Sequence, residues 1–283
     1  MARIVAVHGI AQQGKGPNWI HRDWFDPLCD GLRYSGIAPK KADLVCPAYG
    51  DLFRREAMGM GEEEIDEAEI TADDEQLIRL VWAELARIDP QNVIAPDKQI
   101  MGLHHRIAHK AFEAICHSRR LTNLGMKGAA FFIRSLKQVT AYMEDPRVRL
   151  DAREIVSRAI TDDTRVVVGH SLGSVVSYEV LCENSRNVRA FVTLGSPLGI
   201  RNLIFDRLRP APVDGRGQWP GGIARWYNFA DENDVVALQK RLSVLFGERV
   251  QDAIVDNDLD AHEARYYLTD RRTGEAIAWG LQP

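Results

Sequence analysis

The chain has 283 residues, of which 45% are hydrophobic and 27% are charged, and its net charge at pH 7 is −4. These are ordinary values for a globular protein with a sizeable core, in one large or two small domains. The mild negative charge argues against nucleic acid as the main partner, because proteins that bind phosphate backbones carry a basic surplus. Four scattered cysteines without a Cys-x-x-Cys pair argue against a disulfide framework or a zinc site.

The first residues favour neither a signal peptide nor a membrane anchor. The apolar run over 4–7 is too short for the hydrophobic part of a signal peptide and leads into a glycine loop. No stretch of the chain approaches the length of a membrane-spanning helix. We therefore expect a cytoplasmic protein with reduced thiols and no integral membrane segment.

The amino-terminal part alternates between strand and helix patterns. Residues 4–7 predict a buried strand, 9–17 a loop, 19–34 a helix and 42–48 a second strand. Strands that alternate with helices in this way imply a parallel sheet with helices on both faces.

This alternation breaks at residues 52–143, for which we predict helices over 63–87, 98–118 and 124–143 and no strand. An acidic block in the first part of the segment is followed by a basic stretch. The favoured interpretation is two solvated faces that attract each other. The alternative is a mobile cap whose basic face meets anionic substrate or the surface of a membrane.

The alternation resumes after Pro146. We predict a helix over 150–160 with Asp151 as its cap, and a long loop over 206–222 that is rich in proline and glycine. The further elements are strands over 165–168, 188–194, 223–229 and 249–255, a helix over 172–182 and a mostly helical segment over 262–279. The prediction is therefore one α/β domain over 1–283, with a mostly parallel sheet flanked by helices and a helical cap inserted at 52–143.

The strongest motif is Gly169-His170-Ser171-Leu172-Gly173, which follows the β-branched run over 165–168. A buried strand that turns sharply into a helix at Gly-x-Ser-x-Gly is typical of a nucleophile elbow, which exposes its serine at the end of the sheet. Glycines suit so tight a turn because a side chain there would collide with its neighbours. Ser171 is the predicted nucleophile; the alternative is a small-residue turn without chemistry.

A serine nucleophile needs a base, and the base needs a carboxylate to orient it. On a nucleophile-elbow fold these residues follow in the order serine, acid, histidine. His262 is the only histidine after Ser171, which makes it the predicted base. Asp231 and Asp234 both follow the strand over 223–229. We favour Asp234, whose backbone the following apolar pair would anchor, and Asp231 remains the alternative.

The predicted oxyanion hole uses two backbone N–H groups. One belongs to Leu172, at the start of the helix after the serine, where unpaired amides and the helix dipole favour negative charge. The other belongs to Ile10, in the loop after the first strand. His8 is expected to shape that loop by hydrogen bonding rather than to act as a base.

These residues together resemble the α/β-hydrolase superfamily, and within it the lipase- and esterase-like serine hydrolases. The matching segments are Val7-His8-Gly9-Ile10, the elbow, Thr193-Leu194-Gly195-Ser196-Pro197-Leu198-Gly199, Asn228 with the two aspartates, and His262. The pattern departs from the family in two ways: we expect no counterpart of the family's first two strands before residue 4, and the predicted helical insertion precedes the elbow strand.

The resemblance implies a Ser171–Asp234–His262 triad and an acyl–serine intermediate that water hydrolyses. The expected substrate is a small-molecule or lipid-like carboxylic ester, with no metal and no organic cofactor. Amide or thioester cleavage uses the same triad, and a catalytically idle binding protein is the alternative from another class.

Two further patterns bear on function. Residues 9–16 match Gly-x-x-x-x-Gly-Lys, but Gly16 stands where a phosphate-binding loop carries the serine or threonine that binds magnesium, so nucleotide hydrolysis is disfavoured. Residues 125–142, which include Phe132, carry a broad apolar stripe at helical spacing. The favoured interpretation is that the stripe packs on the core, and the alternative is that it roofs the pocket above Ser171.

Overall fold

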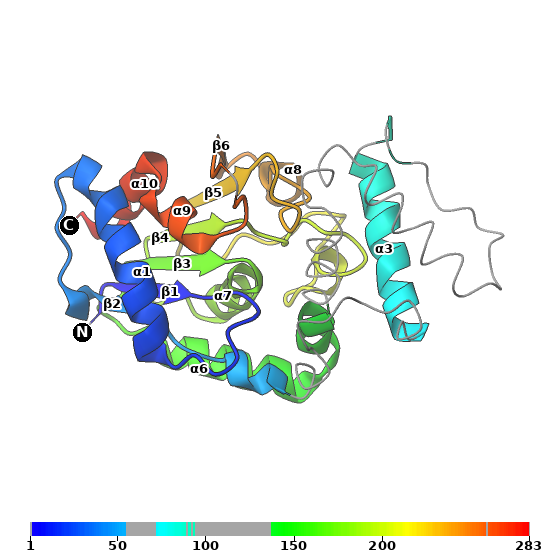
Figure 1. Ribbon diagram of the computed structural model, residues 1–283, viewed down its shortest axis with the longest axis horizontal. Coiled ribbons are helices and arrows are strands. Elements are labelled where there is room, and N and C mark those ends of the chain that lie inside the picture. Colours follow the sequence, from blue (N-terminus) through cyan, green and yellow to red (C-terminus); the bar gives the residue numbers. More distant parts are fainter. Residues whose placement is uncertain are drawn as a thin grey trace.

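A six-stranded parallel sheet forms the centre of the molecule. The computed structural model describes residues 2–54, 72–88, 90–91, 93, 137–258 and 260–282. The sheet has the order β2-β1-β3-β4-β5-β6 (Figure 1). Its strands are β1 (Ile4–Val7), β2 (Leu44–Val45), β3 (Val166–His170), β4 (Ala190–Leu194), β5 (Arg225–Asp231) and β6 (Val250–Val255).

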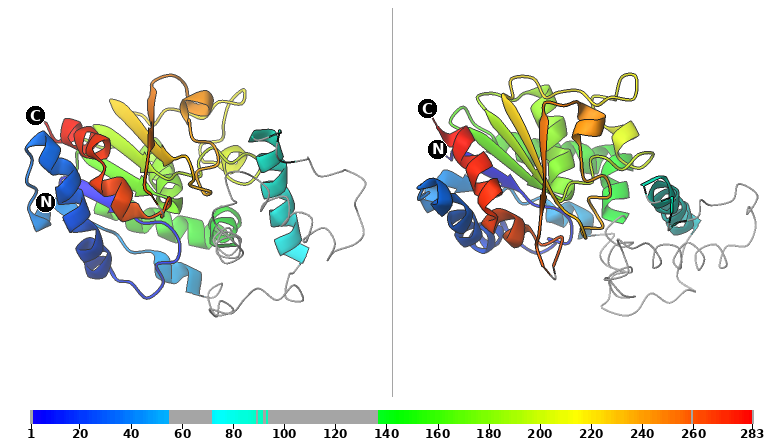
Figure 2. Two further views of the ribbon diagram at one scale, coloured as in Figure 1. Left: turned by 45° about the horizontal axis from the view of Figure 1, so that its top comes forward. Right: turned by 90° about the horizontal axis from the view of Figure 1, so that it is seen from above.

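Helices cover both faces of this sheet. One face carries α1 (Pro17–Leu32), α9 (Ala264–Thr269) and α10 (Arg271–Leu281), and the other carries α6 (Pro146–Ala159) and α7 (Leu172–Glu183). In Figure 2, α1 and α10 lie side by side. Alternate strand residues enter the two cores, so that Ile4 packs with α1 and Val5 packs with α7. Burial on both faces explains the nearly continuous apolar runs of β1, β3 and β4, and the predicted α/β class is confirmed.

Two local predictions need correction, and a third is confirmed in finer detail. The strand over 42–48 shrinks to Leu44–Val45, at the edge of the sheet and shortly before Pro47, which has no N–H to give to a ladder. Asp151 does not cap α6: the helix begins at Pro146, and the Asp145 side chain accepts hydrogen bonds from two N–H groups of its first turn. The segment 262–279 is mostly helical, as predicted; it contains two helices, and Asp270 between them caps the second.

Shorter elements connect these helices and strands. They are the 3-10 helices η1 (Arg33–Ser35), η2 (Lys41–Asp43), η3 (Gly50–Phe53) and η5 (Phe205–Arg207), and the four-residue helix α8 (Ser243–Phe246). The predicted loop over 206–222 forms no other helix or strand apart from one isolated bridge.

The described parts of the 52–143 insertion are mostly helical. Helix α3 (Ala72–Ile88) overlaps the predicted helix over 63–87, and residues 137–144 form a helix that ends just before α6. Figure 1 shows α3 on the side of the molecule opposite the two termini, which is the side where the strands end. The predicted helix over 98–118, most of that over 124–143 and Phe132 lie outside the described residues.

The helix over 137–144 is joined to α6 and α7 by a buried cluster around Glu179. The Tyr142 hydroxyl donates to Glu179 Oε2 over 2.7 Å, and Arg149 Nε donates to the same oxygen over 3.0 Å. Glu179, on α7, is fully buried. Because Tyr142, Arg149 and Glu179 lie on different helices, these bonds hold the 137–144 helix, α6 and α7 together. Removal of Arg149 or Glu179 would leave the other charge buried and uncompensated.

The sheet order places two loops side by side. The chain leaves β1 for β2 on one side, whereas β3 and the later strands follow on the other side of β1. In open parallel sheets, ligands bind beyond the carboxyl ends of the strands at such a reversal. Val7 pairs with Gly169, so the loop after β1 and the residues after β3 emerge together at this point.

Candidate functional site

Ser171 occupies the turn between β3 and α7 in a strained conformation. Its φ of 52° and ψ of −131° lie in a region that residues with a side chain rarely adopt. The flanking glycines make the turn possible, since a Cβ on Gly169 would come within 2.6 Å of the Ser174 Cα and one on Gly173 would overlap the Val7 carbonyl oxygen. The Ser171 N–H donates to the Leu194 carbonyl over 3.0 Å. The surrounding chain therefore imposes this conformation on the serine.

The loop after β1 lies directly against this serine. A Cβ on Gly9 would be 2.5 Å from the Ser171 Cβ and 3.0 Å from its Oγ, so only glycine allows the approach. Ile10 and Leu172, the predicted oxyanion donors, are the residues that follow Gly9 and Ser171. Leu172 is the first residue of α7, where helical N–H groups have no preceding carbonyl to pair with.

His8 braces the same loop from within the core. Its Nδ1 lies 2.6 Å from the Gly9 carbonyl oxygen, its Nε2 accepts the Tyr49 N–H over 3.2 Å, and the two rings stack at 4.3 Å. These partners require a neutral ring with its proton on Nδ1. Burial lowers the pKa of His8 to about 4, which keeps it neutral. The arrangement matches the loop-shaping role expected for His8.

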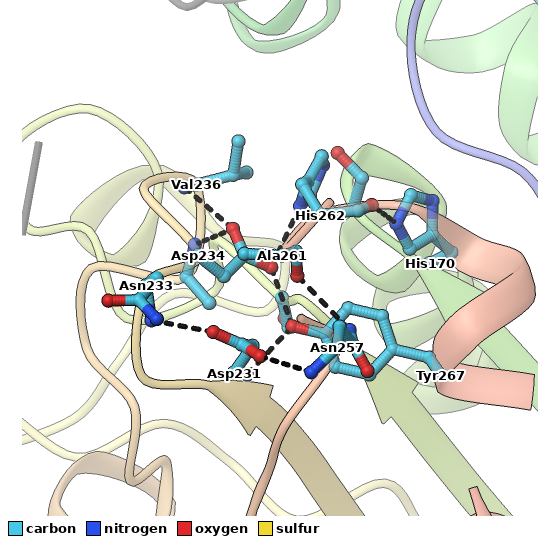
Figure 3. Close-up of polar contacts among 12 residues, drawn as sticks. His170, Asp231, Asn233, Asp234, Val236, Asn257, Ala261, His262 and Tyr267 are labelled. Carbon is cyan, nitrogen blue, oxygen red and sulfur yellow. Dashed lines mark hydrogen bonds and ion pairs between the residues drawn. The ribbon is translucent and has the colours of Figure 1, made fainter. Parts of the chain in front are cut away.

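Asp234 meets His262 above the end of β5 (Figure 3). Asp234 Oδ2 lies 2.8 Å from His262 Nδ1, and Oδ1 accepts the N–H groups of Val236 and Ala237 over 2.9 and 3.2 Å. Burial by itself would raise the pKa of Asp234, but His262, Lys240 and the hydrogen bonds outweigh burial and hold this pKa below its usual range. Asp234 is therefore a buried carboxylate that orients the imidazole.

Asp231, the alternative acid, binds backbone N–H groups through its carboxylate. It is the last residue of β5, and its carboxylate accepts the Asn233 and Asn257 N–H groups, each over 2.6 Å. These bonds fasten the turn after β5 to the loop after β6. Of the two candidate acids, the structure therefore brings Asp234 to His262 and uses Asp231 to hold the backbone.

The second ring nitrogen of His262, Nε2, differs from Nδ1 in its surroundings. Nε2 is buried and has no hydrogen-bond partner within the described part of the chain, so Ser171 Oγ and His262 Nε2 are not hydrogen-bonded in this structure. His262 lies over Gly195, where a Cβ would come 3.0 Å from Nδ1 and 2.5 Å from Asp234 Oδ2. His170 and Leu194 are paired at the ends of the neighbouring strands β3 and β4. Ser171 follows the first of these strands and Gly195 follows the second, so Ser171 and the imidazole over Gly195 lie at the same edge of the sheet. A base, its orienting acid and a strained serine at one sheet edge could together perform nucleophilic catalysis.

The sequence analysis did not identify three residues that contact His262 or Asp234, namely His170, Tyr267 and Lys240. His170 Nε2 lies 2.7 Å from the His262 carbonyl oxygen, and the two rings are 4.7 Å apart; burial, and then His262, lower the pKa of His170 to about 3. The Tyr267 hydroxyl lies 2.7 Å from Asp234 Oδ2, and buried Lys240 donates to the Asp234 carbonyl. His170 could have been suspected from its place beside Ser171, whereas the other two carry no sequence signal.

The remaining features of the described chain point to no second site of known type. Among the residues described, no group of three or more His, Cys, Asp or Glu could hold a metal ion, and no helix is long and apolar enough to cross a membrane. A hollow lined by 140–141 and 144–147 includes none of the predicted site residues.

Comparisons with models of known families, with curated proteins and with solved structures find no match to this chain.

Proposed function

We propose that this protein is a serine hydrolase of the α/β-hydrolase type that cleaves carboxylic esters through Ser171, His262 and Asp234. The observation that carries the proposal is the coincidence of a strained serine and a histidine–aspartate pair whose Nε2 has no partner among the described residues. The strand order β2-β1-β3-β4-β5-β6 is not the usual order of the hydrolase sheet, so the proposal rests on the site rather than on the fold.

The proposed reaction begins with proton transfer from Ser171 Oγ to His262 Nε2 as the oxygen attacks the ester carbonyl carbon. Asp234, held by two backbone N–H groups, stabilises the imidazolium that forms and keeps its Nδ1 proton inward. The N–H groups of Ile10 and Leu172 stabilise the developing oxyanion. His262 then returns its proton to the leaving alcohol, and water hydrolyses the acyl–serine in a second cycle.

The substrate class is proposed from the triad chemistry alone. Esters are the simplest substrates for this chemistry, and amides or thioesters would be attacked in the same way. A lipid-like or acylated substrate, with the insertion in contact with a membrane surface, remains the more specific proposal. A catalytically idle binding protein is the rival, and it has no chemical need for a strained serine at the same sheet edge as an imidazole that a carboxylate orients.

A panel of p-nitrophenyl esters from acetate to palmitate tests the proposal. The wild-type protein should hydrolyse at least one ester, and Ser171→Ala should lower kcat by about a million-fold without loss of the folded state. The matched control is Ser177→Ala, on the same helix, because Ser177 is buried and its Oγ has no partner among the described residues. An inactive wild-type protein, or a Ser171→Ala variant with most of the activity, would overturn the proposal.

A further inference from the structure

We infer that Tyr267 is a positioning residue for the acid of the site: its hydroxyl fixes the Asp234 carboxylate in the orientation that His262 requires. The inference rests on the proposed function. Tyr267 lies on α9, five positions after His262, and its side chain is fully buried. One short segment therefore carries both the base and the hydroxyl that contacts the acid (Figure 3).

The hydrogen bonds of the hydroxyl determine where its proton points. The Asp231 N–H donates to Tyr267 Oη over 2.8 Å, and Oη lies 2.7 Å from Asp234 Oδ2. A carboxylate can only accept, so the single hydroxyl proton is directed to Asp234. Burial and the neighbouring carboxylate raise the pKa of Tyr267 well above its usual value, so the hydroxyl keeps this proton.

This bond completes the set of donors around the carboxylate. Oδ1 accepts two backbone N–H groups, and Oδ2 accepts both His262 Nδ1 and the Tyr267 hydroxyl. The hydroxyl shares the negative charge of Oδ2 with the imidazole. Without it, the carboxylate would be free to tilt, and its charge would interact with the imidazolium more strongly.

The same bond connects the two aspartates after β5. Asp231 fastens the turn through its carboxylate, and its N–H reaches Asp234 through the Tyr267 hydroxyl. The other titratable or charged groups around His262 and Asp234 are Lys240 after β5, His170 on β3, and Asp260 and Glu263 beside His262. Tyr267→Phe leaves all of these in place, so a changed pH profile would report the lost hydroxyl.

The test compares Tyr267→Phe with Tyr178→Phe in the full-length protein. Tyr178 is an equally buried tyrosine whose hydroxyl donates to the Gln218 carbonyl over 2.8 Å, and it controls for the loss of a buried hydrogen bond. Tyr267→Phe should lower kcat for the best p-nitrophenyl ester by roughly tenfold, as expected for a lost hydrogen bond to a charged group, and should change KM less than twofold. The acidic limb of its kcat/KM profile should move to higher pH.

A proton NMR measurement separates this inference from the proposed function. The proton between His262 Nδ1 and Asp234 should give a far-downfield resonance in the wild-type protein, with or without ester hydrolysis. Tyr267→Phe should shift or broaden it, and Tyr178→Phe should not. An unchanged resonance and pH profile in Tyr267→Phe, or the same changes in Tyr178→Phe, would overturn the inference.

A second substitution covers the case in which Tyr267→Phe does not fold. Incorporation of 3-fluorotyrosine at position 267 keeps the shape of the side chain and makes the hydroxyl a stronger donor. The acidic limb should then move to lower pH, opposite to the phenylalanine variant. No movement in the fluorinated protein would count against a role for this hydroxyl.

Discussion

The two sides of the candidate site are held in different ways. The acid–base side consists of two short segments, 231–237 and 262–267, whose side chains bind one another through Asp234 and Tyr267. The other side, called the oxyanion side after the role proposed for Ile10, is the loop after β1, and it is held by residues far along the chain. Gly14 N–H donates to Asp51, and Ala11 N–H donates to Gln138 Oε1 over 3.1 Å.

The insertion over 52–143 contacts the oxyanion side of the candidate site through Gln138. Gln138 belongs to the helix over 137–144, within the predicted insertion, and its side chain is only 3% exposed. Ala11, which it holds, has a φ of 56°, a conformation that is costly for a residue with a Cβ. The insertion therefore restrains the loop that carries Ile10, whereas the carboxylate of Asp234 is held by the N–H groups of Val236 and Ala237 and by the 262–267 segment.

The largest expected effect distinguishes the two aspartates on the acid–base side. Asp234→Asn should lower kcat about ten-thousand-fold, because the imidazole loses its orienting carboxylate and can adopt the wrong tautomer. Asp231→Asn should cost far less and should act mainly through stability, since Asp231 binds backbone N–H groups. Steady-state kinetics and thermal melting of both variants measure this, and the reverse ranking in kcat would assign the acid to Asp231.

A smaller effect is expected on the oxyanion side. Gln138→Leu removes the acceptor of the Ala11 N–H and should lower kcat by roughly tenfold with little change in KM, because a displaced loop weakens binding of the developing oxyanion. Gln138→Asn keeps an uncharged amide acceptor on a shorter side chain and should lower the rate less than Gln138→Leu does. The downfield proton of the His262–Asp234 pair should be the same in both variants. A change in that proton would show that the two sides are not held independently.

The third prediction concerns stability rather than activity. It involves two buried histidines, His8 on the oxyanion side and His170 on the acid–base side. His8 and His170 are neutral in the folded protein, with pKa values lowered to about 4 and about 3 by burial. In the unfolded chain both take up a proton near pH 6.5. Their contribution to stability is therefore fully present above pH 6.5 and is lost as the pH falls toward the pKa values of the folded state.

This loss can be measured by urea unfolding between pH 7 and pH 4.5. For His8 the full contribution is about 3 kcal/mol, at 1.36 kcal/mol for each unit of pKa difference. His8→Asn and His170→Asn should each flatten the dependence of stability on pH. If neither variant changes this slope, other groups govern the acid sensitivity of the fold.

Local patterns in the sequence predicted the elements that local physics determines. The β-branched runs at 4–7 and 165–168 became buried parallel strands, and the glycine-flanked Ser171 lies in a turn of the predicted kind. Tyr267 and Gln138 could not be predicted, because their roles depend on contacts with residues 33 and 127 positions away. The helix cap at Asp145 could have been found from Pro146, which marks a first helical position.

Covalent labelling with a fluorophosphonate probe tests the central claim most directly, because such a probe reacts with a serine whose oxygen is activated by a neighbouring base. The wild-type protein should form one adduct, which peptide mass spectrometry should place on Ser171. Asp234→Asn should slow the labelling, and Ser171→Ala should abolish it while the melting temperature stays near that of the wild type. A folded wild-type protein that forms no adduct, or an adduct on another residue that persists in Ser171→Ala, would contradict the account.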